Sequence, residues 1–169
     1  MYIVLGVVAG VVATSFVKIL YFSEDLFDNL PVPPILLPII AGVAIGLLGY
    51  ISPGIYGIGY ETIEQALHSD MALKTILFLL VTKIVATSLT LAGGGSGGIF
   101  APSLFLGAMT GGAVGVVANY LNLWPTAEPA AYALVGMAAV VAATTHAPLT
   151  AIIVIFELTG NYEIILPLM

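Results

Sequence analysis

The sequence predicts an all-α, polytopic membrane protein in which several helices are broken or re-entrant. Two observations predict this class. Of the 169 residues, 60% are hydrophobic and only 7% are charged, with a mean hydropathy of +1.16, and stretches rich in glycine and proline interrupt the long apolar segments. Backbone groups that face lipid have no water to bond, so apolar segments there must be helical. The composition excludes an ordinary soluble domain.

Five apolar segments approach the length of about 20 residues that crosses a bilayer. The first should end near Phe22, before an acidic loop at 23–30, and the second should begin after the prolines within 31–34. Residues 52–70 should form a loop and a short amphipathic helix, and these lengths predict about six to eight helical segments. The five apolar segments are 2–22, 35–51, 71–92, 99–121 and 131–158.

The most informative break is the run Gly-Gly-Gly-Ser-Gly-Gly-Ile-Phe-Ala-Pro-Ser at 93–103. Each glycine costs about 1 kcal/mol relative to alanine inside a helix, whereas Pro102 is tolerated in a first helical turn. One helix therefore ends and another begins at membrane depth. The new helix presents free N–H groups and a partial positive charge to a space lined by glycine, which lets a ligand approach the backbone. The sequence thus predicts an anion held by backbone amides.

A second break, Thr-Thr-His-Ala-Pro at 144–148, divides the last long apolar segment. Paired interruptions of this kind are typical of transporters whose binding sites lie between broken helices. A polar connection at 119–129 should separate the two broken segments. Near the end of the chain, Asn161 is expected to cap a further helix that starts at Tyr162.

Three series of glycines are spaced three or four residues apart. Small residues at this spacing let helices approach closely in lipid, so the series predict helix packing rather than a ligand site. They are Gly6 and Gly10; Gly42, Gly46 and Gly49; and Gly107, Gly111 and Gly115.

The net charge and the absence of cysteine exclude several classes of partner and cofactor. A net charge of −6 argues against nucleic acid and against electrostatic docking to anionic lipid. The absence of cysteine excludes disulfides and thiolate metal sites, and neither His68 nor His146 has ligand partners at a metal-binding spacing. We therefore expect no metal and no cofactor.

No Lys or Arg precedes the first apolar run, so it should be a membrane helix, or the middle of a longer chain, rather than a signal peptide.

Lys83 and Glu157 are charged residues placed well inside apolar runs. Intramembrane ionisable residues are costly and are expected to face the protein interior. We expect the two to pair, or each to bind carbonyls and amides at a nearby helix break. A role of Glu157 in proton movement is the less favoured interpretation.

Residues 94–98 also match the G-x-S-x-G pattern of serine nucleophiles, with Ser96 at its centre. With His146 as its base, the chain would be an intramembrane serine protease. The pattern is weak in so glycine-rich a run, and it leaves Phe100-Ala-Pro unexplained. We therefore predict that the chain is not an enzyme and keep the protease as a remote alternative.

The segment Gly98-Ile99-Phe100-Ala101-Pro102 resembles the G-x-F-x-P signature of the CLC family of chloride channels and chloride/proton antiporters. The resemblance extends over nearly the whole chain. Further similar blocks are 83–91, 103–108, 147–151, 156–162 and, more weakly, Gly59-Tyr60-Glu61.

The resemblance implies two inverted-topology halves with an anion between the N-termini of broken helices, and homodimers in which each subunit has its own pore. It implies that the backbone N–H groups of Ile99 and Phe100 bind the anion. Gly98 would give access, and Pro102, after Ala101, would set the helix start. The implied function is passive or proton-coupled transport of chloride across a plasma or inner membrane, with chloride as the transported ligand.

Two blocks of that family are absent from 1–169. G-S-G-I-P gives the anion a serine hydroxyl, and G-R/K-E-G-P contains the gating glutamate. The tyrosine that closes the site in many members would lie beyond Met169. We therefore expect 1–169 to be a partial domain, the second half of a CLC-type membrane domain without its last helices, whose partner is the missing first half. The alternative is a non-conducting fragment or assembly partner.

Overall fold

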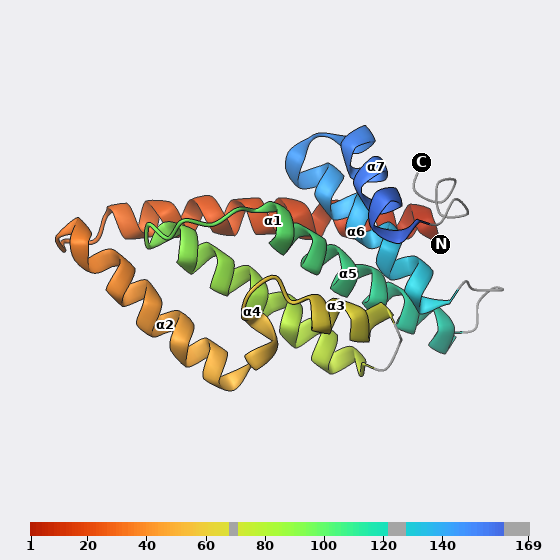
Figure 1. Ribbon diagram of the computed structural model, residues 1–169, viewed down its shortest axis with the longest axis horizontal. Helices are drawn as coiled ribbons and strands as arrows, with labels where there is room; N and C mark the ends of the chain where they lie inside the picture. The colour runs from red at the N-terminus through yellow and green to blue at the C-terminus, as the bar shows by residue number, and fades with distance from the viewer. Residues whose placement is uncertain (68–70, 122–127, 161–169) are drawn as a thin grey trace.

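The computed structural model describes residues 1–67, 71–121 and 128–160, so His68 and the predicted cap Asn161 lie outside the described residues. Within these ranges the chain forms α-helices and short 3-10 helices (η) and no strand, which confirms the all-α class. The elements, drawn in Figure 1, are α1 (Tyr2–Asp28), η1 (Pro34–Leu36), α2 (Leu37–Ile51), η2 (Pro53–Ile55), α3 (Tyr60–Leu67), α4 (Leu73–Ala92), α5 (Phe100–Leu121), α6 (Pro129–Thr145) and α7 (Pro148–Thr159).

Four helical stretches are long and apolar enough to cross a membrane. They are α1, the continuous stretch formed by η1 and α2, α4, and α5. The helices α6 and α7 have 17 and 12 residues. At about 1.5 Å per residue they are shorter than a hydrocarbon core of about 30 Å. The chain is therefore an integral membrane protein with full and partial spans, as the sequence predicts.

The first helix is longer than predicted, because the expected acidic loop at 23–30 is helical as far as Asp28. Polar residues do not end the helix: the Ser23 hydroxyl donates to the carbonyl of Ile19 at 2.8 Å within it. Phe27 is buried and holds the last turn against the protein. The helix ends only where the side-chain amide of Asn29 donates to a carbonyl of the last turn, just before the prolines.

The helices α5 and α6 form the centre of the molecule, and α1 and α4 pack against them (Figure 1). Phe105 of α5 and Phe16 of α1 are completely buried in this block. Helix α2 leaves the far end of α1 and slopes back towards the middle of the chain (Figure 1). Ser103, in the first turns of α5, is fully buried in this block, whereas Phe100 at the start of the helix is exposed.

Glycines on α5 let it approach α6 closely. A Cβ at Gly107 would overlap the backbone of Met137, and one at Gly111 would overlap the carbonyl oxygen of Tyr132. A Cβ at Gly115 would lie 3.0 Å from the Cα of the first residue of α6. The packing prediction is confirmed for this series.

The other two glycine series do not pack in this way. A Cβ at Gly49 would overlap the ring of Tyr56. At the other four glycines of these series, a Cβ would meet no atom of the described residues within 4 Å: Gly6, Gly10, Gly42 and Gly46. Close approach between helices of this chain therefore does not explain why these four positions are glycine.

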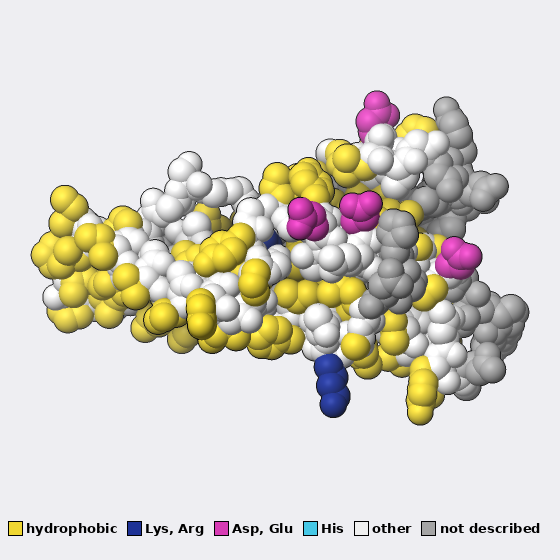
Figure 2. Space-filling model, turned by 60° about the horizontal axis from the view of Figure 1, so that its bottom comes forward, with side chains coloured by type: hydrophobic (Ala, Val, Ile, Leu, Met, Phe, Trp, Pro, Cys, Tyr) yellow, Lys and Arg dark blue, Asp and Glu magenta, His cyan; other side chains and the backbone are white. Residues whose placement is uncertain are grey.

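Helix α2 leaves most of its apolar surface uncovered. It buries only Ala41 and Gly49 within the part of the chain that the structure describes. Figure 2 shows hydrophobic side chains covering the end of the molecule where α1 and α2 meet, and acidic side chains in the opposite half of that face. Such a surface is suited to lipid or to further apolar protein.

Candidate functional site

The glycine-rich segment first ends α4 with a tight turn. The N–H groups of Gly93, Gly94 and Gly95 donate to carbonyls in the last α4 turn at 3.0, 3.0 and 2.9 Å. Gly94 has a φ of +80°, a left-handed conformation that favours glycine. A Cβ at Gly95 would lie 2.6 Å from the carbonyl oxygen of Thr90. These glycines are therefore required by the turn itself.

The last two glycines of the run leave the backbone open. A Cβ at Gly98 would meet no described atom within 4 Å. A Cβ at Gly97 would touch the side chain of Leu91 at 3.6 Å, an ordinary contact. Gly98 therefore has open space beside its backbone, and its role in giving an anion access stays a prediction.

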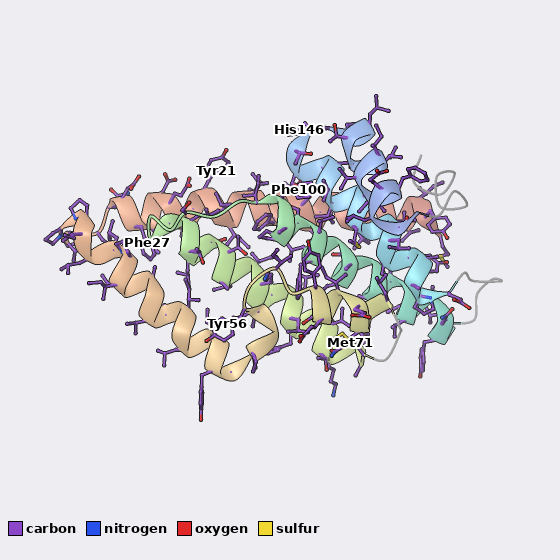
Figure 3. The ribbon with its side chains drawn as sticks, in the orientation of Figure 1. Tyr21, Phe27, Tyr56, Met71, Phe100 and His146 are labelled. Carbon is purple, nitrogen blue, oxygen red and sulfur yellow. The ribbon has the colours of Figure 1, made fainter. Side chains whose placement is uncertain are left out.

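Helix α5 begins at Phe100 and has Pro102 in its first turn, as predicted (Figure 3). The first amides of a helix have no partner within it, and those of Ile99, Phe100 and Ala101 donate to no backbone carbonyl in the described ranges. Ile99 and Phe100 are 37% and 40% exposed. The structure thus brings the predicted residues 98–102 together at one helix start with free N–H donors.

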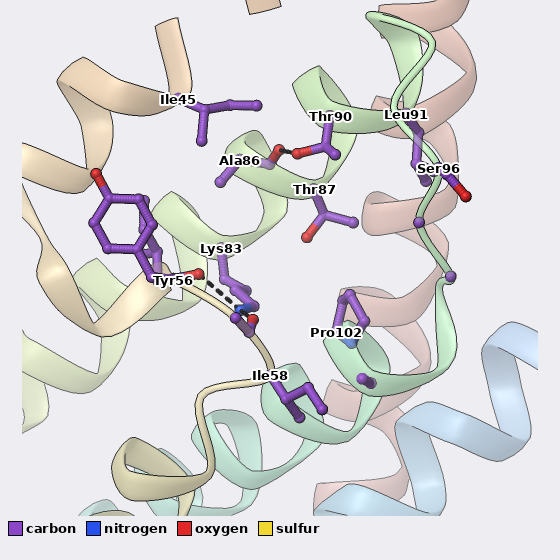
Figure 4. Close-up of a pocket in the computed structure, with 15 residues that line it drawn as sticks. Ile45, Tyr56, Ile58, Lys83, Ala86, Thr87, Thr90, Leu91, Ser96 and Pro102 are labelled. Atoms are coloured by element: carbon purple, nitrogen blue, oxygen red, sulfur yellow. Dashed lines mark hydrogen bonds between the residues drawn. The ribbon is translucent and has the colours of Figure 1, made fainter. Parts of the chain in front are cut away.

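A cavity of about 460 Å³ adjoins this helix start (Figure 4). Its walls come from α4, from the loop between α2 and α3, and from the glycine-rich segment. Most of its lining is apolar, with a few hydroxyl groups and one ammonium group, a combination typical of small-ligand sites. Lining residues include Tyr56, Ile58, Lys83, Thr87, Thr90, Ser96, Gly97, Gly98, Ala101 and Pro102.

Lys83 reaches from α4 across the wall of the cavity. Its ammonium group donates to the carbonyls of Ile55 and Gly57 at 2.9 and 2.8 Å and lies 4.9 Å from the ring centroid of Phe105 (Figure 4). No ion pair joins it to Glu157 within the described residues, and Glu157 is exposed on α7. The predicted Lys83–Glu157 pair is therefore wrong, and the alternative, carbonyl binding at a helix break, is confirmed for Lys83.

Two buried hydroxyl groups lie behind the helix start, and no pattern in the sequence predicts their pairing. Ser103 is fully buried, and its Oγ donates to the carbonyl of Ile99 at 2.7 Å. Thr144, in the last turn of α6, is 9% exposed and places its Oγ1 3.1 Å from the Ser103 Oγ. The end of α6 is thereby tied to the beginning of α5.

The residues of the protease alternative do not form a dyad in the described chain. Ser96 lines the cavity, with its hydroxyl directed away from Lys83 (Figure 4). His146 ends α6 with a φ of +55° in the turn before α7 (Figure 3). No hydrogen bond joins the two in the ranges that the structure covers, where no cluster of three or more metal-ligating side chains occurs either.

Comparisons with known proteins agree over the full chain. A family model described as voltage gated chloride channel matches residues 1–169. The chain is 36% identical over 168 residues to a protein of Ralstonia nicotianae named as a ClcB-like chloride channel, covering 99% of this chain and 39% of that one. It is also 36% identical over 172 residues to the H(+)/Cl(-) exchange transporter ClcA of Salmonella typhi, covering 99% of this chain and 36% of the relative.

The fold is similar to a solved structure as well. A slow cyanobacterial Cl−/H+ antiporter superposes with a TM-score of 0.86 at 34% identity, over 99% of this chain and 40% of that chain. This similarity supports the arrangement of broken helices around the start of α5. The chain spans 36 to 40% of the length of these relatives.

Proposed function

The chain belongs to the voltage gated chloride channel family, and from this premise we propose that it forms part of a pathway that carries chloride across a membrane. The single observation that carries the proposal is the start of α5, where the amides of Ile99 and Phe100 have no backbone acceptor in the described chain, Gly98 leaves the backbone open, and the flanking Gly98 and Ala101 line a cavity. Relatives named as a chloride channel and as H(+)/Cl(-) exchangers support chloride as the ion.

The proposed binding needs no covalent chemistry. Chloride exchanges part of its water shell for the N–H groups of Ile99 and Phe100, and the positive end of α5 offsets its charge. Gly98 lets the ion approach, while Pro102, which follows Ala101 and has no N–H, fixes the helix start. Binding remains modest because a transported ion has to leave its site.

We further propose that the rest of a CLC-type membrane domain completes the site, and that two such subunits form a homodimer. The fraction of the relatives that this chain spans supports the first point. The uncovered apolar surface of α2 supports the presence of further apolar protein or lipid around it. A non-conducting assembly partner remains the second candidate, whereas the names of the relatives do not favour the Ser96/His146 protease.

The test is chloride flux from liposomes that contain the full parent protein of this chain. Gly98→Leu should reduce the flux at least tenfold, because its side chain would cover the amides at the start of α5. Gly42→Leu is the matched control, since an added Cβ at either glycine meets no described atom within 4 Å and only Gly98 adjoins the free amides. Equal flux from the two variants would contradict the proposal.

A further inference from the structure

We propose that Ser103 and Thr144 are positioning residues that orient the anion-binding amide of Phe100 through the Ile99 carbonyl. This inference rests on the proposed function, because it assigns a role to two residues behind the same site. Neither residue is in the set 98–102 that the sequence predicts, and neither is among the lining of the cavity described above.

A single peptide unit joins Ile99 to Phe100. The carbonyl of Ile99 and the N–H of Phe100 belong to the same planar peptide, so they point in opposite directions and turn together. The carbonyl accepts two hydrogen bonds from Ser103, one from its N–H at 3.0 Å and one from its Oγ at 2.7 Å. Holding the carbonyl on the helix side holds the N–H of Phe100 on the other side, where the chain is open.

The hydroxyl groups of Ser103 and Thr144 are hydrogen-bonded to each other. A hydroxyl has one proton and two acceptor lone pairs. Ser103 gives its proton to the Ile99 carbonyl and accepts from Thr144 at 3.1 Å. The Thr144 Oγ1 also lies 2.9 Å from the carbonyl of Val140 and 3.1 Å from that of Val141, so its proton is shared among three acceptors. Both hydroxyls are buried, so water does not compete for them.

The Ser103 hydrogen bond is more than ordinary back-bonding within a helix. A serine or threonine in a helix often donates to the carbonyl four residues before it, and Thr110 of the same helix does so to Leu106 at 2.7 Å. Ser103 differs in two ways. A hydroxyl on another helix donates to it, and its acceptor carbonyl belongs to the residue just before α5.

The consequence is electrostatic as well as geometric. Hydrogen bonds in a chain polarise one another, and a carbonyl that accepts two of them makes the N–H of its own peptide a better donor. Removal of the Ser103 hydroxyl should therefore weaken anion binding more than it disturbs folding.

The experiment measures chloride flux against chloride concentration for the full parent protein in liposomes. Ser103→Ala should raise the half-saturating concentration about three- to tenfold, as expected for the loss of one hydrogen bond, with unchanged protein yield. Ser103→Thr, which keeps the hydroxyl, should have the half-saturating concentration of the wild-type protein. Thr144→Val should have a smaller effect in the same direction, and the double variant should equal Ser103→Ala because Thr144 acts through Ser103.

Thr110→Val is the matched control, since Thr110 is equally buried on α5 and makes the same bond four residues back. It should leave the half-saturating concentration unchanged. If Ser103→Ala had the same half-saturating chloride concentration as the wild-type protein, the positioning role alone would be overturned. Absence of chloride flux from the wild-type parent would overturn the proposed function and this inference with it.

Discussion

At the scale of single residues, the buried charge of Lys83 shows how this fold accommodates a cation in an apolar helix. Lys83 is only 3% exposed, and its ammonium group binds two carbonyls of the loop between α2 and α3. The ring of Phe105 adds a favourable cation–π contact. The side chain thereby holds that loop against α4 and forms one wall of the cavity.

Replacing Lys83 by methionine should destabilise the protein by about 1–3 kcal/mol, because the carbonyls of Ile55 and Gly57 lose their donor while the volume is kept. The measurement is the thermal unfolding midpoint in detergent. Lys74→Met is the control: Lys74 is exposed on the same helix, and its replacement should shift the midpoint little. Similar midpoints for the two variants would show that the carbonyl contacts contribute nothing.

Some residues of the proposed site can be predicted from the sequence and others cannot. The helix start at Phe100 and the place of Pro102 follow from local chemistry, since glycine and proline limit the backbone directly. The contact between Ser103 and Thr144 joins residues 41 positions apart. It depends on how closely α5 approaches α6, which no pattern within either segment specifies.

At the scale of elements, the contact between α5 and α6 holds the helix start in place. Gly107 and Gly111 bring the backbone of α5 onto that of α6, close to Tyr132 and Met137. Small residues at such interfaces allow extensive van der Waals contact in a membrane. A site made of amides at the first turn of α5 therefore depends on this packing further along the helix.

Gly111→Ala should destabilise the protein by about 1–3 kcal/mol, because the new methyl group would overlap the Tyr132 carbonyl and force the helices apart. Gly112→Ala provides the comparison on the same helix. Its methyl group would meet only the Ile76 side chain, at 3.8 Å, so the gain in helix propensity of about 0.5–1 kcal/mol should dominate. Unfolding midpoints in detergent distinguish the two, and a Gly111→Ala protein as stable as wild type would contradict the packing argument.

The positions of most helices could be predicted because length, hydropathy and the glycine and proline breaks act locally. The error at the end of α1 has a physical cause. Ser23 and the acidic residues after it are polar but remain compatible with a helix, and the burial of Phe27 extends it. Glycines with the same spacing also have different surroundings, since a Cβ at Gly107 would overlap α6 and one at Gly42 would meet no described atom within 4 Å.

At the scale of the whole molecule, the chain is a compact block of α1, α4, α5 and α6 from which α2 diverges with an apolar surface (Figure 1). The start of α5 lies in the block, whereas α2 has little contact beyond η1, η2 and α4. In a bilayer, lipid or further protein has to cover that surface. The complete anion pathway is thus proposed to be a property of the longer protein.

Liposomes that contain only the 169-residue chain should show no chloride flux, whereas liposomes with the full parent should show it. The physical reason is that the amides of Ile99 and Phe100 provide one side of the proposed site. The two preparations should be matched for protein incorporated, and circular dichroism should show that the shorter chain is helical. Flux from the shorter chain alone would mean that its helices assemble a pore among themselves.

The glycine-rich segment contains a helix C-terminus and a helix N-terminus, and it makes the two poles unequal. Three of its amides, those of Gly93, Gly94 and Gly95, bond to carbonyls at the negative end of α4. The amides at the positive end of α5 have no backbone acceptor in the described chain. An anion in the adjoining cavity would therefore meet the unpaired donors of α5, whereas three carbonyls at the end of α4 already accept hydrogen bonds. The break between α4 and α5 would thus favour negative charge at membrane depth through backbone groups, in addition to the ammonium group of Lys83 in the cavity wall.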